Sequence, residues 1–195
     1  AQDTLVIFMH DNGGTAGVRV FNADMHGAKG TAWLGGTRAS SFWRWPGTIT
    51  PGDCGVLSAH IDFFPTLAEI AGAKIPAAAK SQVAGRSLVP LCKGTTPADW
   101  RKSLYYHYYE FPVPHRVRPH SGVITDRFKL VHYYKPDVND WELLDREKDP
   151  LEVQNFYNDP AYAQTVKELH AEVERLRKEV QETGEPPRTA YGNQP

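Results

Sequence analysis

The sequence predicts a mixed α/β fold (α+β), in which the end of an α/β sheet domain is followed by a small four-stranded antiparallel sheet packed by a C-terminal helix. Strand-like and helix-like segments alternate through the first half, which favours an α/β layer. After Trp100, short aromatic and β-branched runs are separated by turn residues, as in an antiparallel meander. Apolar residues then recur at helical spacing near the C-terminus. We therefore divide the chain into residues 1–99, 100–183 and a tail, 184–195.

The first strand is predicted at Thr4–Met9, where a continuous apolar run is typical of a strand that is buried on both faces. Such a strand needs neighbours, and we expect them in sequence that precedes this chain. Without them, an apolar edge favours pairing between copies of the chain. A glycine-rich loop runs from Asp11 to Arg38, and a second strand is predicted at Ala39–Trp45, where Pro46 ends it.

A helix is predicted at His60–Ala71, and Gly72 is a suitable residue to end it. Its apolar residues fall on one face, which is made by Ile61, Phe64, Leu67, Ala68 and Ala71. Residues 73–99 are rich in Ala, Lys, Pro and Gly, which is typical of a connecting loop with a short turn.

Four short strands are predicted in the second part: Leu104–Glu110, Gly122–Thr125, Phe128–Tyr134 and Trp141–Asp145. A helix then begins at Asp159, a capping residue, with Pro160 at the first helical position. It carries a single apolar stripe: Tyr162, Val166, Leu169, Val173, Leu176 and Val180. This stripe would cover one face of the sheet. A short coiled-coil seam is the alternative, although fewer than three full heptads are present.

Composition limits the classes of partner. Hydrophobic residues make up 41% of the chain and charged residues 23%, as in a globular protein, and the formal net charge is −1. The absence of a basic stripe argues against nucleic acid, and no apolar run is long enough for a membrane span. Cys54 and Cys92 have no diagnostic spacing, so a disulfide and the redox compartment stay open.

The end of the first strand carries a possible cation site. Asp11 and Asn12 are followed there by Gly13 and Gly14. Ligands gather at the carboxyl ends of strands in open α/β sheets, and a carboxylate beside a carboxamide offers two oxygen ligands to a hard cation. A simple strand-exit turn is the alternative, because Asp-Asn-Gly is favoured there for local reasons.

Further short motifs follow in order. Lys29 lies between Ala28 and Gly30, so its ammonium and the nearby backbone can both approach an anion. The runs DNGG, HGAKGT, GGTR, FWRWPGTITPG, HIDFFPTLAEIAG and GRSLVPL resemble the C-terminal half of type I sulfatases, the formylglycine-dependent sulfuric ester hydrolases of the alkaline phosphatase superfamily. The runs YYHYYEF, GVITDRFKLVHYY and WELLDREKDPLEVQNFYNDP resemble the small C-terminal domain of the same enzymes. The resemblance covers residues 3–182.

The resemblance implies roles for three residues. Asp11 and Asn12 match two ligands of the active-site Ca²⁺, which is Mg²⁺ in some members of the family. Lys29 matches the catalytic lysine that binds a sulfate oxygen, where its charge would offset charge on the sulfuryl group and on the leaving oxygen. If these residues share one sulfate, the Asp11 carboxylate and the Lys29 ammonium should lie within roughly 10 Å of each other.

The chain also departs from the family pattern. Neither Cys54 nor Cys92 lies in a Cys/Ser-x-Pro/Ala-x-Arg motif, so the formylglycine nucleophile is expected only in an upstream part, with the remaining metal ligands. Leu34 stands where many relatives have Glu. We therefore expect the isolated chain to bind Ca²⁺ poorly and to hydrolyse sulfate esters at no more than background rate.

The expected substrate is a sulfated carbohydrate or an aryl sulfate. The aromatic stretch from residue 107 to 134 looks most like enzymes that remove 6-sulfate from N-acetylglucosamine in glycosaminoglycans or mucin. His26 and His115 are candidates to contact substrate, and ordinary loop histidines are the alternative for both. His60 and Asp62 are expected to shape a helix end rather than bind a ligand.

Two other functions stay open. The chain could be a non-catalytic or truncated module that self-associates or binds a partner. As part of a sulfatase, its expected partner is the N-terminal half of that enzyme. The chain could also belong to a phosphatase or phosphodiesterase of the same superfamily, although the lysine and glycine motifs favour sulfate. Family resemblance implies a periplasmic, secreted or lysosomal location.

Overall fold

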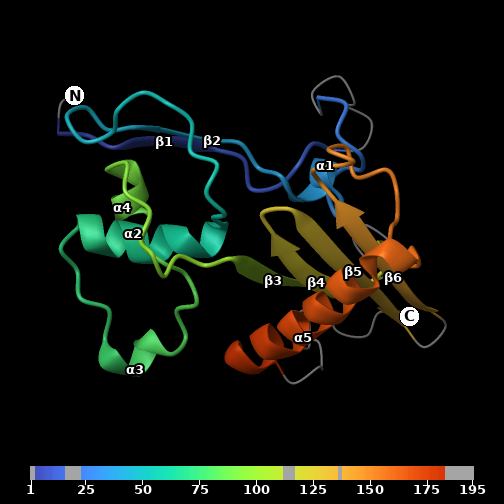
Figure 1. The fold of residues 1–195 in the computed structure, drawn as a ribbon. Helices are drawn as coiled ribbons and strands as arrows, with labels where there is room; N and C mark the ends of the chain where they lie inside the picture. Colours follow the sequence, from blue (N-terminus) through green and yellow to red (C-terminus); the bar gives the residue numbers. More distant parts are fainter. Residues whose placement is uncertain (1–2, 16–22, 112–116, 136–137, 183–195) are drawn as a thin grey trace.

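A computed structural model describes residues 3–15, 23–111, 117–135 and 138–182 (Figure 1). It contains a two-stranded and a four-stranded sheet, both antiparallel. The mixed α/β prediction is confirmed, including the four-stranded antiparallel sheet with its C-terminal helix. No helix in these ranges is both long and apolar enough to cross a membrane.

The two predicted N-terminal strands form a two-stranded ribbon. β1 (Val6–Met9) pairs with β2 (Ser41–Arg44), with Val6 opposite Arg44 and Met9 opposite Ser41. The predicted burial of β1 is wrong for this chain, because the Phe8 side chain is 62% exposed and its cross-strand partner Phe42 is 63% exposed. An apolar run indicates that a strand needs neighbours against both of its faces. Among the described residues, no third strand joins this ribbon.

The helical segment after the ribbon buries Asp62, Pro65 and Thr66 rather than its apolar face. A 3₁₀ turn at His60–Asp62 leads into α2 (Phe63–Ile70), and Gly72 follows with φ +65°. The apolar face faces outward, since Phe64 is 60% exposed. Thr66 is fully buried instead, and its hydroxyl accepts a hydrogen bond from the Leu88 backbone N–H (2.8 Å). The predicted loop contains two short helices, α3 (Ala77–Lys80) and α4 (Val89–Cys92).

The C-terminal part is a four-stranded meander. Its strands run in the order β3 (Ser103–Tyr108), β4 (His120–Thr125), β5 (Phe128–Lys135) and β6 (Val138–Asp145). A 3₁₀ turn at Pro160–Tyr162 follows, capped by the Asp159 side chain, and leads into α5 (Ala163–Glu179). Figure 1 shows α5 lying across one face of the sheet.

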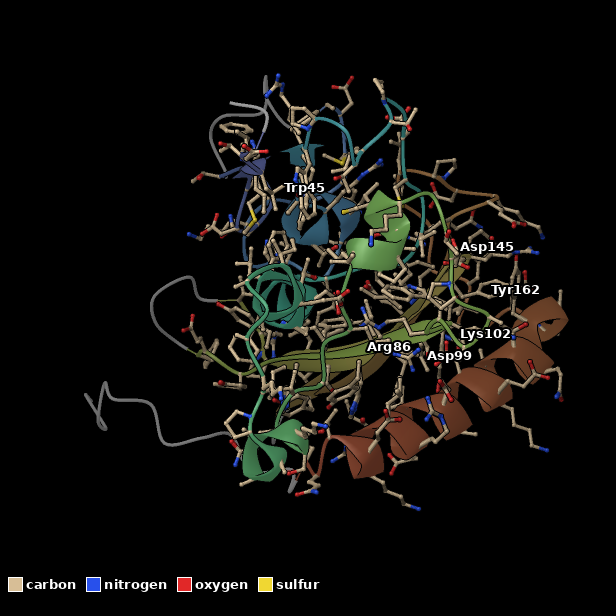
Figure 2. All side chains as sticks on the ribbon, turned by 90° about the vertical axis from the view of Figure 1, so that its left-hand side faces the viewer. Trp45, Arg86, Asp99, Lys102, Asp145 and Tyr162 are labelled. Carbon is tan, nitrogen blue, oxygen red and sulfur yellow. The ribbon has the colours of Figure 1, made fainter. Side chains whose placement is uncertain are left out.

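The main core lies between α5 and the sheet. Its buried members are Val123, Leu130, Leu143, Phe156, Tyr162, Leu169, Val173 and Leu176. The predicted stripe therefore covers the sheet of its own chain, as expected, and only its last member, Val180, is exposed. At one end of this core, the buried Asp145 carboxylate accepts hydrogen bonds from Tyr162 (2.8 Å) and from Arg127 (Figure 2). Cys54 and Cys92 are both free thiols.

Candidate functional site

The loop that carries Lys29 is anchored to the sheet face opposite α5. Lys129 on β5 is almost fully buried, and its ammonium donates to the Ala32 carbonyl (2.9 Å) and to the Glu152 carboxylate (2.7 Å). Burial lowers the pKa of Lys129, and the neighbouring Glu152 opposes that shift. The Lys129 ammonium thus joins the Ala32 carbonyl of the loop to the sheet, and this buried contact fixes the position of the loop.

Two aromatic contacts strengthen this anchor. The His26 ring stacks on Trp33, with centroids 4.1 Å apart, and its Nδ1 lies 2.6 Å from the Glu152 carbonyl oxygen. The Trp33 indole N–H donates to the Glu142 carboxylate (3.1 Å). His26 therefore lies against the C-terminal part and is not among the described residues that line the cleft beside Lys29. Its suggested contact with substrate stays a prediction.

Close backbone contacts bring the two predicted site segments together. The Lys29 N–H donates to the Gly14 carbonyl (2.8 Å), and the Gly13 N–H donates to the Gly36 carbonyl (3.0 Å). A Cβ atom on Gly13 would lie only 1.8 Å from the Gly35 carbonyl oxygen, so no larger residue fits there. The glycines of this loop thus allow the strand exit and the lysine loop to pack backbone to backbone.

The result is a cleft of about 340 Å³ between the loop and the sheet. Its lining residues are Asn12, Lys29, Gly30, Thr31, Gly36, Thr37, Tyr106, His107, Tyr108, Glu110 and His120. Asn12 and Lys29 therefore share one cavity. Asp11 is exposed and is not among the described lining residues, so its predicted approach to Lys29 stays a prediction. His115 lies outside the described residues.

The donors at the strand exit fit part of a hard-cation site. Asn12 donates its side-chain N–H to the Gly13 carbonyl (2.8 Å), which leaves the amide oxygen available as a ligand, and the Asp11 carboxylate is exposed beside it. Hard cations take six to eight oxygen ligands. Within the described ranges no group of three or more His, Cys, Asp or Glu residues could hold a metal. Asp11 and Asn12 would therefore supply a minority of the ligands.

One wall of the cleft is aromatic and comes from β3 and β4. His120 is only 2% exposed, its Nδ1 donates to the Arg118 carbonyl (2.8 Å), and its ring stacks on Tyr108 at 5.2 Å. Burial lowers the pKa of His120, so the imidazole is neutral at pH 7. Sequence reasoning singled out the aromatic stretch from residue 107 to 134 but assigned neither Tyr108 nor His120 to a cleft wall, and it missed the Lys129–Glu152 anchor.

The predicted role of His60 and Asp62 at a helix end agrees with the structure. The buried Asp62 carboxylate accepts hydrogen bonds from the backbone N–H groups of Ala59 (2.9 Å) and Arg86 (2.8 Å), and it pairs with the Arg101 guanidinium. His60 contacts the His10 carbonyl through Nε2 (3.0 Å). Arg86, which also lies near Asp99, is labelled in Figure 2. These contacts tie α2 to the segments around it.

Comparisons with known proteins identify sulfatase relatives. The family model described as N-sulphoglucosamine sulphohydrolase, C-terminal, matches residues 35–179. An N-acetylglucosamine-6-O-sulfatase of Bacteroides thetaiotaomicron is 41% identical over 139 residues, which cover 70% of this chain and 24% of that protein. Human arylsulfatase A is 34% identical over 137 residues, covering 68% of this chain and 25% of that protein.

A solved structure supports the same relationship. It is a protein in complex with its substrate D-glucosamine-2-N,6-O-disulfate, and it matches with a TM-score of 0.75 at 33% identity. The match covers 93% of this chain and 35% of that structure. The chain thus spans about a quarter of the length of the two curated relatives, and about a third of this structure.

Proposed function

The chain belongs to the N-sulphoglucosamine sulphohydrolase C-terminal family of sulfatases, and from this premise we propose that it forms part of the active site of an enzyme that hydrolyses sulfate esters of glycans. The observation that carries the proposal is the meeting of Asn12 and Lys29 in one cleft. Lys29 reaches that cleft from a loop whose backbone is held by hydrogen bonds, including that from the buried Lys129 ammonium to the Ala32 carbonyl. The position of the Lys29 backbone at the cleft is therefore fixed.

In this proposal, Lys29 binds a sulfate oxygen and stabilises the charge that develops as the ester bond breaks. Asp11 and Asn12 would supply some of the ligands of a Ca²⁺ or Mg²⁺ ion. When bound, this ion would polarise the sulfate as a Lewis acid. The nucleophile, a formylglycine, would come from another part of the protein. The isolated chain is therefore proposed to have no turnover of its own.

The substrate class follows from the relatives and from the wall of the cleft. Two of the similar proteins act on or bind 6-sulfated glucosamine units, by their names. In this chain, Tyr106, Tyr108 and His120 line the cleft opposite the Lys29 loop, and aromatic walls with a few polar groups suit a sugar ring. We therefore favour a sulfated glycan over a small aryl sulfate.

Exposed apolar side chains in the N-terminal part favour a binding partner that covers them. Phe8 and Phe42 on the β1–β2 ribbon and Phe64 on α2 are all more than half exposed. We propose that the formylglycine-bearing part of the sulfatase covers them. Self-association of the isolated chain, as expected of a non-catalytic module, is the second candidate, because the same surface could pair two copies.

The proposal is tested by removing the charge at Lys29. When this chain is combined with the formylglycine-bearing part, Lys29→Ala should lower sulfate release from glucosamine 6-sulfate by about two to three orders of magnitude. Lys80→Ala is the matched control, because Lys80 is an exposed lysine on α3 and does not line the cleft. Unchanged kinetics of Lys29→Ala would refute the assignment of this lysine.

A further inference from the structure

A second cavity lies at the outer edge of the four-stranded sheet. It has a volume of about 570 Å³, which is within the range of small-molecule sites. It forms between β6 and the segment that follows it, and shares no lining residue with the Lys29 cleft. Its lining residues are Tyr133, Asn139, Asp140, Trp141, Glu142, Asn155, Tyr157 and Asn158. We call it the β6 cavity.

The lining combines aromatic rings with amides and carboxylates. Asp140 and Asn158 are exposed, and their side chains make no hydrogen bond with any residue in the described ranges. Glu142 accepts a hydrogen bond from the Tyr133 hydroxyl (2.9 Å). The described lining contains two carboxylates and neither lysine nor arginine. Such a surface suits hydroxyl groups that donate hydrogen bonds, and it repels sulfate and carboxylate groups.

The β6 cavity is held in shape by contacts that its lining residues make with one another and with their neighbours. Asn155 donates to the Trp141 carbonyl (3.0 Å) and accepts from the Leu143 N–H (3.0 Å), which fixes the following segment against β6. The Trp141 ring stacks on His132 at 4.0 Å. The Tyr157 hydroxyl is hydrogen bonded to His170 on α5 (3.0 Å). A site fixed in this way loses little conformational entropy when a ligand binds.

One row of side chains connects the two cavities. Tyr108, His120, Tyr133 and Asp140 lie directly opposite one another on β3, β4, β5 and β6, so their side chains share one face of the sheet. The His120 ring lies 5.2 Å from that of Tyr108 and 5.5 Å from that of Tyr133. With strands about 4.8 Å apart, this row spans about 15 Å. Its first two members line the Lys29 cleft and its last two line the β6 cavity.

We propose that the β6 cavity is a subsite for an uncharged sugar unit of the same glycan whose sulfate ester binds beside Lys29. This inference rests on the proposed function and deepens it, because it selects between substrate classes. A glycan with a neutral backbone places an uncharged sugar in the cavity. A uronate-containing glycan places a carboxylate near Asp140 and Glu142, where like charges repel.

The first experiment measures binding without catalysis. The probe is an unsulfated tetrasaccharide of alternating galactose and N-acetylglucosamine, and saturation-transfer NMR detects its binding to this chain. We expect a Kd of about 1 mM. Asp140→Lys should weaken binding about tenfold. Glu168→Lys makes the same charge change on an exposed position of α5 and should leave binding unchanged.

Circular dichroism shows whether Asp140→Lys has folded. Asn158→Ala, a milder change on an exposed segment, serves as a second variant and should weaken binding several-fold. Absence of saturation transfer at about 20 mM tetrasaccharide, where a millimolar site is nearly full, would overturn the subsite. Equal weakening by Glu168→Lys would also overturn it, because the effect would then be one of net charge.

The second experiment separates this inference from the proposed function. In the combined enzyme, kcat/KM is compared for a 6-sulfated neutral tetrasaccharide and for 6-sulfated N-acetylglucosamine alone. Asp140→Lys should lower the ratio of these two values about tenfold and favour uronate-containing substrates. Turnover that depends on Lys29 with an unaltered ratio would refute only the subsite. Tetrasaccharide binding without any sulfatase activity would refute only the proposed function.

Discussion

The β1–β2 ribbon with α2 and the four-stranded sheet with α5 place their apolar residues in opposite ways. In the ribbon, Phe8 faces outward, whereas Leu143 in the sheet is fully buried beneath α5. Both regions have strong apolar patterns in sequence. The difference teaches that the sheet and helix complete each other within this chain, while the ribbon and α2 present surfaces suited to contacts with another chain or segment.

The largest expected effect comes from breaking the buried ion pair of the sheet region, whose lysine also binds the Lys29 loop. Lys129→Met leaves the Glu152 carboxylate buried without its partner, and should lower the free energy of unfolding by about 3–5 kcal/mol. Chemical denaturation measures the loss. The double variant Lys129→Met/Glu152→Gln should recover part of it, because no buried charge then stays unpaired. If the double variant is no more stable than the single one, the ion pair is not the cause.

Two side-chain truncations test the difference in packing between the two regions. Leu143→Ala should lower the free energy of unfolding of this chain by about 2–5 kcal/mol, because it opens a cavity in the core. Phe64→Ala should change it by less than about 0.5 kcal/mol, because Phe64 is 60% exposed. Light scattering should also show less self-association for Phe64→Ala. Equal destabilisation by both changes would show that α2 is packed as tightly as the sheet.

A smaller, pH-dependent effect is expected at the end of the core. The hydrogen bond from Arg127, helped by that from Tyr162, holds the pKa of Asp145 well below its usual range. A depressed carboxyl pKa stabilises the fold above the unfolded pKa, near 3.9, and this contribution is lost as the pH falls further. Asp145→Asn should therefore cost about 1–2 kcal/mol at pH 7 and progressively less below pH 4, measured by denaturation. A penalty that is constant down to pH 2 would contradict this account.

Sequence reasoning found the elements whose pattern is local. The stripe from Tyr162 to Val180 and the capping pair at Asp159 predicted α5, and short aromatic and β-branched runs between turn residues predicted the meander. It also named Asn12 and Lys29, which the structure brings into one cleft.

It could not predict features that depend on distant residues. Lys129 looks like a surface lysine until Glu152 and the Ala32 carbonyl are placed beside it. The backbone of Glu152 itself adopts φ +57°, a conformation that its residue type does not predict. The exposure of β1 likewise depends on which strands lie beside it rather than on its own composition.

The anchoring of the Lys29 loop has a consequence for the order of events during synthesis. Its three ties join residues that are 97, 109 and 126 positions apart: Ala32 with Lys129, Trp33 with Glu142, and His26 with Glu152. At about 5–20 residues per second, a ribosome supplies these partners several seconds after the loop has emerged. The Lys29 loop therefore lacks these ties until Glu152 has been translated, and its fixed position is among the last features of this chain to form.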